Sequence, residues 1–316
     1  MTCADIGLTA NIAGLSYDLN SAKIRLMSYD LGLSSNRRLS QRSPNQIYGD
    51  SDLGFRVDPR FSDWFWNIKG DTLADYRNQR ALIMEIFQPR DNDPVQLVLD
   101  LGDRVRALDV NLDGELLFSD RVEKIENVSG VFKSSDPRLY HPTLITEVFD
   151  LAGSSGSNLG WAIPWPIPWG IGTDILNLVK VIEYADLSRL GAPEYPVIRI
   201  IGPIDNPVIA NETTGEIIDL SDGTGISLAD SSEWVEVDLA DFPRRESKTI
   251  RNQDGESVDQ YLTTDSDLAT FHIAPAGEKL SSGAYCTGEN TIRISGTGVD
   301  STTQVSLKYY DRYRAV

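Results

Sequence analysis

The residues best suited to chemistry by type and spacing are Asp109, Asn111 and Asp113, which are followed by Gly114. This order matches the first half of a calcium-binding loop, where alternating oxygen ligands precede a glycine turn. The twelfth position of such a loop needs a bidentate glutamate, and this chain has Asp120 there. The flanking residues alternate with a period of two, which predicts strands and not the helices of that motif. We therefore interpret Asp113-Gly114 as a hairpin turn and expect no bound metal or cofactor.

Catalysis by acid–base or nucleophilic chemistry usually needs a positioned histidine, lysine or pair of carboxylates. The chain has two histidines, His141 and His272, and neither lies next to a cysteine or a nucleophile-elbow sequence. Metalloprotease, phosphate-loop and dinucleotide signatures do not occur. Carboxylate pairs are frequent, but none is distinguished by its spacing, so a secreted glycosidase has no specific support. We expect both imidazoles to be structural and the protein not to be an enzyme.

The charge balance restricts the classes of partner. Asp and Glu number 47 against 29 Lys and Arg, a formal net charge of −18. Stable binding to nucleic acid or to an anionic membrane needs the opposite balance. An acidic wall could instead line a conduit past which a polyanion slides. The two cysteines, Cys3 and Cys286, suggest neither a disulfide framework nor a zinc site, and we expect neither a secretion signal nor a membrane helix.

The elements that would position these residues fall into two blocks, as a length of 316 residues leads us to expect. One helix is predicted over 71–87, because Asp71 or Thr72 can cap it and Asp75 completes a capping box. Its expected buried face comprises residues at helical spacing. These are Leu73, Tyr76, Arg80, Ile83, Met84 and Phe87.

Elsewhere the pattern is typical of strands separated by turns, which favours antiparallel sheets. Residues 34–50 are polar and predict a long exposed loop, whereas 175–184 fit either a helix or a strand. The aromatic cluster around Trp64 and Trp66 is interpreted first as core. Strands are expected at 24–27, 108–112, 115–119, 122–132, 196–201, 217–220, 234–239, 291–295 and 304–310.

Between the two blocks lies Trp161–Gly170, with three Trp and three Pro residues. The prolines restrict this segment to extended backbone conformations. It therefore presents large tryptophan rings on a stiff backbone. We interpret the segment as a connection whose rings pack under a neighbouring sheet. A ligand for a partner's groove and a membrane-dipping loop are the alternatives.

Short motifs in a fixed order resemble the distal tail proteins of long-tailed bacteriophages, the siphovirus tail component family. The likeness covers about the last three quarters of the chain, and Asn206–Gly215 is its strongest part. Residues 34–50 have no counterpart in the family's pattern. The segment 230–285 is longer and more acidic than the corresponding segment expected for the family. The other matching segments are Tyr76–Arg80, Leu97–Phe118, Val131–Tyr140, Trp161–Gly170, Ala192–Ile198, Ile201–Pro203 and Ser301–Val316.

The resemblance implies a mainly β fold in two domains. Residues 1–142 would form a tail-tube-like β-barrel or sandwich with one flanking α-helix, which builds a ring. Residues 143–170 would be the Trp/Pro-rich connection, and 171–316 a galectin-like β-sandwich.

It also implies a structural role in the virion, after assembly in the host cytoplasm. Such proteins form a homohexameric ring that joins the tail tube protein to the tail hub and to receptor-binding proteins, while DNA passes through the lumen. Trp64, Trp66, Arg77 and Arg80 are the candidate contact residues. The alternative is a carbohydrate-binding sandwich of a baseplate or secreted protein, with Trp234 as a candidate for stacking on a sugar.

Overall fold

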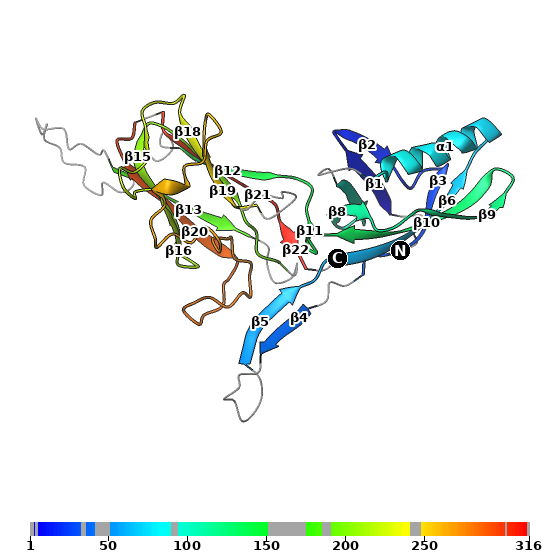
Figure 1. Ribbon diagram of the computed structural model, residues 1–316, viewed down its shortest axis with the longest axis horizontal. Coiled ribbons are helices and arrows are strands. Elements are labelled where there is room, and N and C mark those ends of the chain that lie inside the picture. The colour runs from blue at the N-terminus through cyan, green and yellow to red at the C-terminus, as the bar shows by residue number, and fades with distance from the viewer. Residues whose placement is uncertain are drawn as a thin grey trace, which may run out of the picture. The chain divides into compact units, whose positions relative to one another are not determined.

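The computed structural model describes residues 3, 6–32, 36–41, 51–89, 94–150, 175–184, 191–240, 248–300 and 302–314. This part of the chain is mainly β, with one α-helix, as predicted. It divides into two compact units, 1–142 with 314–316, and 143–313 (Figure 1). The segment Trp161–Gly170 lies outside the described residues.

Unit 1 is built on an antiparallel sheet with the strand order β2-β1-β7-β8-β10-β6-β3. The helix α1 (Leu73–Ile86) follows β6 in the chain. The strands of this unit are β1 (Gly7–Ile12), β2 (Leu15–Asp18), β3 (Ile24–Asp30), β4 (Asn36–Gln41), β5 (Ser51–Val57), β6 (Arg60–Lys69), β7 (Val95–Asp100), β8 (Val105–Leu112), β9 (Leu117–Val122), β10 (Ile125–Ser134) and β11 (Leu139–Tyr140).

The prediction of a long loop over 34–50 is wrong for its first part. Residues 36–41 form β4, which pairs antiparallel with β5 in a separate two-stranded sheet. The sequence of β4 is polar and shows no apolar alternation, which is the signal that predicts a strand.

The chain bends at Gly114, but Asp113-Gly114 does not form the predicted hairpin turn between the strands that flank it. Gly114 has a φ of +101°, a backbone conformation that glycine adopts readily. After the turn β9 pairs with β10 and not with β8. β8 and β9 lie one after the other along the same edge of β10, because Leu112 pairs with Phe132 and Phe118 pairs with Val128. β9 pairs instead with the strand that follows it after two residues, so the Asp113-Gly114 motif does not identify the partner of β9.

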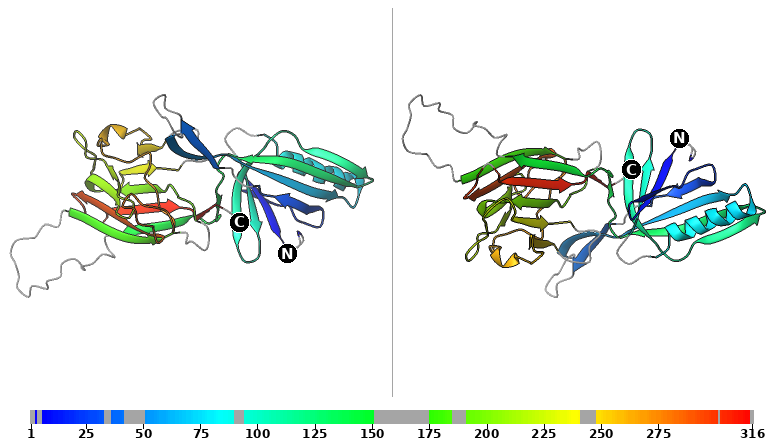
Figure 2. Two further views of the ribbon diagram at one scale, coloured as in Figure 1. Left: turned by 90° about the horizontal axis from the view of Figure 1, so that it is seen from below. Right: turned by 90° about the horizontal axis from the view of Figure 1, so that it is seen from above.

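Alternation along β6 builds the core of unit 1. Trp64, Trp66 and Ile68 are buried, while the residues between them face the other side of the strand. The helix α1 lies over the buried side (Figure 2), and Phe87 at its end packs 5.5 Å from the Trp66 ring. Thr72 caps the helix, as expected, by accepting a hydrogen bond from the Asp75 backbone N–H at 3.1 Å.

The predicted buried face of the helix is only partly correct. Tyr76, Ile83 and Phe87 are buried, but Leu73 and Met84 are 43% and 51% exposed. The helix presents its inner face to β6 over a narrow stripe, so apolar residues at the margins of that stripe stay in solvent.

Unit 2 contains two five-stranded antiparallel sheets, ordered β12-β21-β14-β18-β19 and β13-β20-β15-β16, with β17 pairing to β15. Its strands are β12 (Ile145–Asp150), β13 (Ile175–Glu183), β14 (Val197–Ile201), β15 (Ile204–Asn211), β16 (Glu216–Asp219), β17 (Ser227–Leu228), β18 (Trp234–Asp238), β19 (Thr249–Asn252), β20 (Glu289–Thr297), β21 (Gln304–Tyr309) and β22 (Arg312–Tyr313), with the short 3-10 helix η3 (Asp259–Tyr261).

The two sheets share one apolar core. Val235 and Val305 from the first sheet and Ile209 and Ile292 from the second belong to the same buried cluster. The ambiguous residues 175–184 form the strand β13, which pairs with β20 from Ile175 to Glu183. β12 falls within the stretch 143–170 expected to be a connection, and it pairs with β21. The tail-tube-like and galectin-like descriptions of the two units stay predictions.

Candidate functional sites

Two of the predicted contact residues lie inside unit 1. Trp64 and Trp66 are 1% and 0% exposed, and their rings stack with a centroid separation of 6.0 Å. Tyr29 stacks on Trp64 at 5.4 Å. These indoles support β6 from within, so their side chains offer no surface to another molecule in this fold.

Arg80 is held by neighbours in its own unit. Its Nε lies 3.7 Å from the carboxylate of Glu126, and its guanidinium lies 4.3 Å from the centre of the Phe118 ring. Glu126 is buried and also accepts the hydroxyl hydrogen bond of Tyr76. Burial and this hydrogen bond raise the pKa of Tyr76. Arg80 therefore neutralises a buried carboxylate.

Arg77 differs from Arg80 although the two lie one helical turn apart. Its side chain is exposed, and it has no hydrogen bond or ion pair to any other described residue. Residues 73, 77, 81 and 84 are all exposed, so Arg77 lies on an outer stripe between Leu73 and Met84. Of the four predicted residues, this one is best placed to meet a partner.

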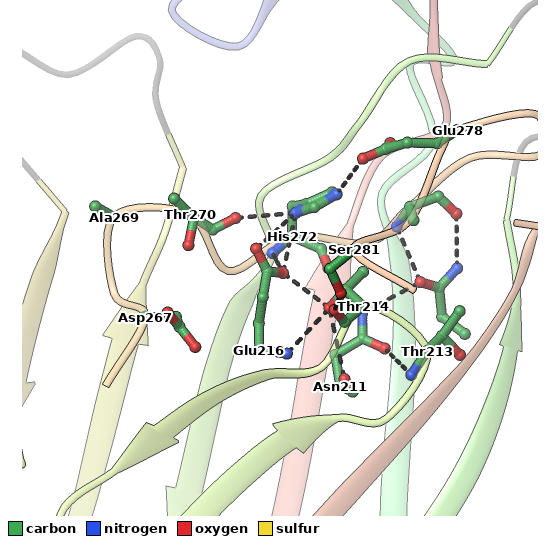
Figure 3. Close-up of polar contacts among 12 residues, drawn as sticks. Asn211, Thr213, Thr214, Glu216, Asp267, Ala269, Thr270, His272, Glu278 and Ser281 are labelled. Carbon is green, nitrogen blue, oxygen red and sulfur yellow. Dashed lines mark hydrogen bonds and ion pairs between the residues drawn. The ribbon is translucent and has the colours of Figure 1, made fainter. Parts of the chain in front are cut away.

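The histidine with the most unusual surroundings is His272 in unit 2 (Figure 3). Its Nε2 lies 2.8 Å from the carboxylate of Glu278, and its Nδ1 lies 3.0 Å from that of Glu216. Nδ1 also lies 2.9 Å from the Thr270 backbone oxygen. The backbone N–H of His272 donates a further hydrogen bond to Glu216 at 3.1 Å. The ring is thus enclosed by acceptors at both nitrogens.

These contacts determine the protonation of the cluster. Burial alone would lower the pKa of His272, but hydrogen bonds to Glu216 and Glu278 outweigh burial and raise it to about 10. Burial would raise the pKa of Glu216, and the hydrogen bonds from His272 and Thr214 lower it instead. An imidazolium with both N–H groups engaged has no lone pair for a proton or a metal. This geometry suits a structural ion cluster, as the sequence led us to expect of His272.

The local fold that positions this cluster is the turn between β15 and β16. Asn211 is fully buried, accepts a hydrogen bond from the Thr213 backbone N–H and donates one to the His272 backbone oxygen at 2.8 Å. Gly215 closes the turn with a φ of +83°. The carboxylate of Glu216 follows directly, so the turn places it beside the imidazole.

Sequence reasoning missed Asn211, Glu216 and Glu278 as members of this cluster. The sequence did single out the segment 206–215 as the strongest motif of the family resemblance, and this segment contains Asn211. Glu216 is 56 residues from His272 in the chain, so only the folded arrangement brings the two together.

The calcium-like sequence lies on β8 and in the turn after it. The carboxylate of Asp109 accepts a hydrogen bond from the Tyr140 hydroxyl at 2.5 Å, and Tyr140 in turn accepts one from Gln96 at 2.7 Å. In the part of the chain that the structure describes, no group of three or more His, Cys, Asp or Glu residues could hold a metal ion.

The cysteines are both free, Cys3 half-buried and Cys286 buried. Burial raises the pKa of the Cys286 thiol. No helix in the described ranges has the length and apolar composition needed to cross a bilayer.

Trp234, the candidate for sugar stacking, already has a cation on its ring. The Arg199 guanidinium lies 4.2 Å from the ring centre and forms an ion pair with Glu236 at 2.7 Å. Arg199 and Glu236 are opposite each other on β14 and β18. One face of the indole is therefore occupied within the protein.

Comparison with known proteins gives matches among solved structures. The crystal structure of the Dit (gp 19.1) protein of phage SPP1, described as a paradigm of hub adsorption apparatus in phages that infect Gram-positive bacteria, has a TM-score of 0.55 at 10% identity, over 97% of this chain and 99% of that one. A chain of the phage P2 baseplate in its activated conformation with Ca has a TM-score of 0.50 at 10% identity, over 98% and 99%. No protein-family model and no curated protein matches. At this identity the likeness establishes a shared fold.

Proposed function

We propose that this protein is a structural component of a bacteriophage tail tip. In this role it forms the distal-tail or baseplate hub ring, which joins the tail tube to the tail hub and the host-recognition apparatus. The observation that carries the proposal is that the chain, over nearly its whole length, shares the fold of a phage hub protein. Motifs in the same order along the sequence support the same assignment independently.

The proposed role is mechanical and not enzymatic. The solved structures with this fold are described as a hub adsorption apparatus and a baseplate, and those descriptions concern assemblies. His272, the histidine held closest by carboxylates, is fixed as an imidazolium between them, which suits stability rather than proton transfer. The formal net charge of −18 suits a wall that repels passing DNA.

The proposed partners are other copies of this chain, in a ring of six, together with the tail tube protein, the tail hub and receptor-binding proteins. The ring would assemble in the host cytoplasm and remain in the virion. Neighbouring copies would make heterologous contacts, because such contacts close into rings when the rotation between subunits allows it.

Negative-stain electron microscopy of the purified full chain tests this proposal. We expect annular particles with a central opening and six-fold averages. A field of single-chain particles at every concentration up to about 100 μM would overturn it, because stable ring contacts hold well below that range. A glycan array addresses the carbohydrate-binding alternative, and we expect no bound glycan.

A further inference from the structure

The sheet face of unit 1 that points away from α1 exposes several large apolar side chains among its polar ones. Along β6, Phe61, Asp63 and Phe65 alternate with the buried tryptophans and so lie on this outer face. Phe61, Leu117, Ile125 and Val131 are each between 40% and 57% exposed. An antiparallel sheet that faces solvent normally presents polar residues at such positions. This face therefore has the composition of a contact surface.

A groove of about 450 Å³ opens on the same face. Phe65, Leu117 and Val131 provide its apolar wall, and Asp30, Asp63 and Glu115 bring three carboxylates to it. Asp30 and Asp63 are directly opposite each other on β3 and β6. Like charges at such positions repel each other, so the groove favours a partner that brings a positive charge.

Two of these carboxylates are unengaged. The side chains of Asp63 and Glu115 are exposed and have no partner among the described residues, whereas Asp30 accepts a hydrogen bond from the Gly32 backbone N–H at 2.8 Å. Apolar walls beside uncompensated negative charge favour a partner that is itself apolar and carries a cation.

The opposite side of the same sheet carries an apolar surface with an exposed cation. The outer stripe of α1 exposes Leu73 and Met84, with Arg77 between them. Arg77 is a cation with no partner in the described chain, whereas Arg80 beside it is engaged with Glu126. Apolar side chains flank the charge in both patches, so the helix stripe and the groove are complementary in charge and alike in their apolar composition.

We propose that the outer stripe of α1 in one copy of this chain docks into the acidic groove of the next copy. Arg77 then pairs with the carboxylates of Asp63 and Glu115, while Leu73 and Met84 cover the apolar wall. The inference rests on the proposed ring, and it specifies which surfaces the subunits use. Two different patches on opposite faces of one sheet make a heterologous contact, the type that closes into a ring when the rotation between copies allows it and otherwise gives an open filament.

Charge reversal tests the pairing. Arg77→Glu and Asp63→Arg should each weaken self-association about 100-fold, because each places like charges in the contact. The double variant, Arg77→Glu with Asp63→Arg, should regain assembly, since the pair is restored in the opposite orientation. Lys279→Glu, a charge reversal at an exposed residue of unit 2, is the matched control and should assemble normally. Sedimentation velocity over a concentration series measures all four, and circular dichroism confirms that each variant is folded.

Mixing the two single variants gives a second, sharper result. In an even-membered ring in which the Arg77→Glu and Asp63→Arg variants alternate, half of the contacts pair the two substituted side chains. The other half pair the two original residues, Arg77 and Asp63, so every contact joins opposite charges. The mixture should therefore assemble although neither variant does so alone. Recovery on mixing also shows that the pairing is between copies and not within one.

The outcomes separate this inference from the proposed function. If the wild-type chain assembles and both single variants assemble equally well, the helix-to-groove contact is overturned. The proposed ring is then unaffected. Loss of assembly in the single variants without recovery in the double variant or the mixture also overturns it. A wild-type chain that stays monomeric overturns the proposed ring itself, and the contact with it.

Discussion

At the scale of single residues, unit 2 contains an ion cluster whose charge state contributes to folding. His272 has a pKa of about 10 in the fold against an ordinary value of 6.5. A raised pKa means that protonation favours the folded state. The stabilisation is therefore complete below about pH 6.5 and is lost as the pH rises towards 10.

We predict that His272→Gln lowers the unfolding free energy by about 3 kcal/mol at pH 6.5, since two largely buried carboxylates lose their cation. The difference between wild type and variant should shrink steadily between pH 6.5 and pH 10. Urea unfolding, followed by circular dichroism across this range, measures the difference. Other groups titrate in both proteins alike, so a constant difference would rule out a structural imidazolium at this position.

The two arginines of α1 should respond differently to the same change. Arg80→Glu places a second carboxylate beside buried Glu126 and removes the cation over Phe118, which we expect to cost about 2 kcal/mol. Arg77→Glu touches no described partner within its own copy and should alter the stability of the dissociated chain by less than about 0.5 kcal/mol. Thermal unfolding at a dilution where wild type and both variants are single chains checks this contrast, because association would otherwise add to the apparent stability. Equal destabilisation would contradict the separate roles.

At the scale of elements, capping residues and apolar–polar alternation correctly predicted where the helix begins and where several strands lie. The helix begins where the Thr72 cap predicts, and strands such as β18 and β21 lie where apolar and polar residues alternate. β4 was missed because its sequence shows no such alternation. The pairing of β9 with β10 was missed because sequence spacing does not show which strand edge is free.

In the candidate sites, the sequence likewise indicated single residues but not the neighbours that the fold brings to them. The sequence predicted a structural role for His272, but it did not predict the two carboxylates beside the ring, one of which lies 56 residues away in the chain. It placed Trp64 and Trp66 among contact residues because exposed and buried aromatic residues look alike in a sequence. Arg77 and Arg80 could be told apart only by the position of Glu126.

We predict that Thr72→Ala destabilises unit 1 by about 1 kcal/mol, because the Asp75 backbone N–H loses its acceptor. Thr72→Ser retains a hydroxyl and should cost much less. Comparison of the two melting temperatures isolates the hydrogen bond, because both variants lose the methyl group and only one loses the hydroxyl. Equal losses in both variants would show that the hydroxyl does not stabilise the helix.

At the scale of the whole molecule, two β units in one chain suit a part that works by its shape and its contacts. The fold resembles that of a phage hub protein along nearly its entire length, although only 10% of residues are identical. The chain is acidic, and unit 1 exposes apolar side chains on one side of its sheet and the cation of Arg77 on the other, which are the features that the proposed self-association would use.

Native mass spectrometry of the full chain measures whether its copies close into the proposed ring. We expect a discrete species of six times the 35.0 kDa of one chain, stable on dilution to micromolar concentration. A single species at 35.0 kDa over the whole concentration range would contradict it.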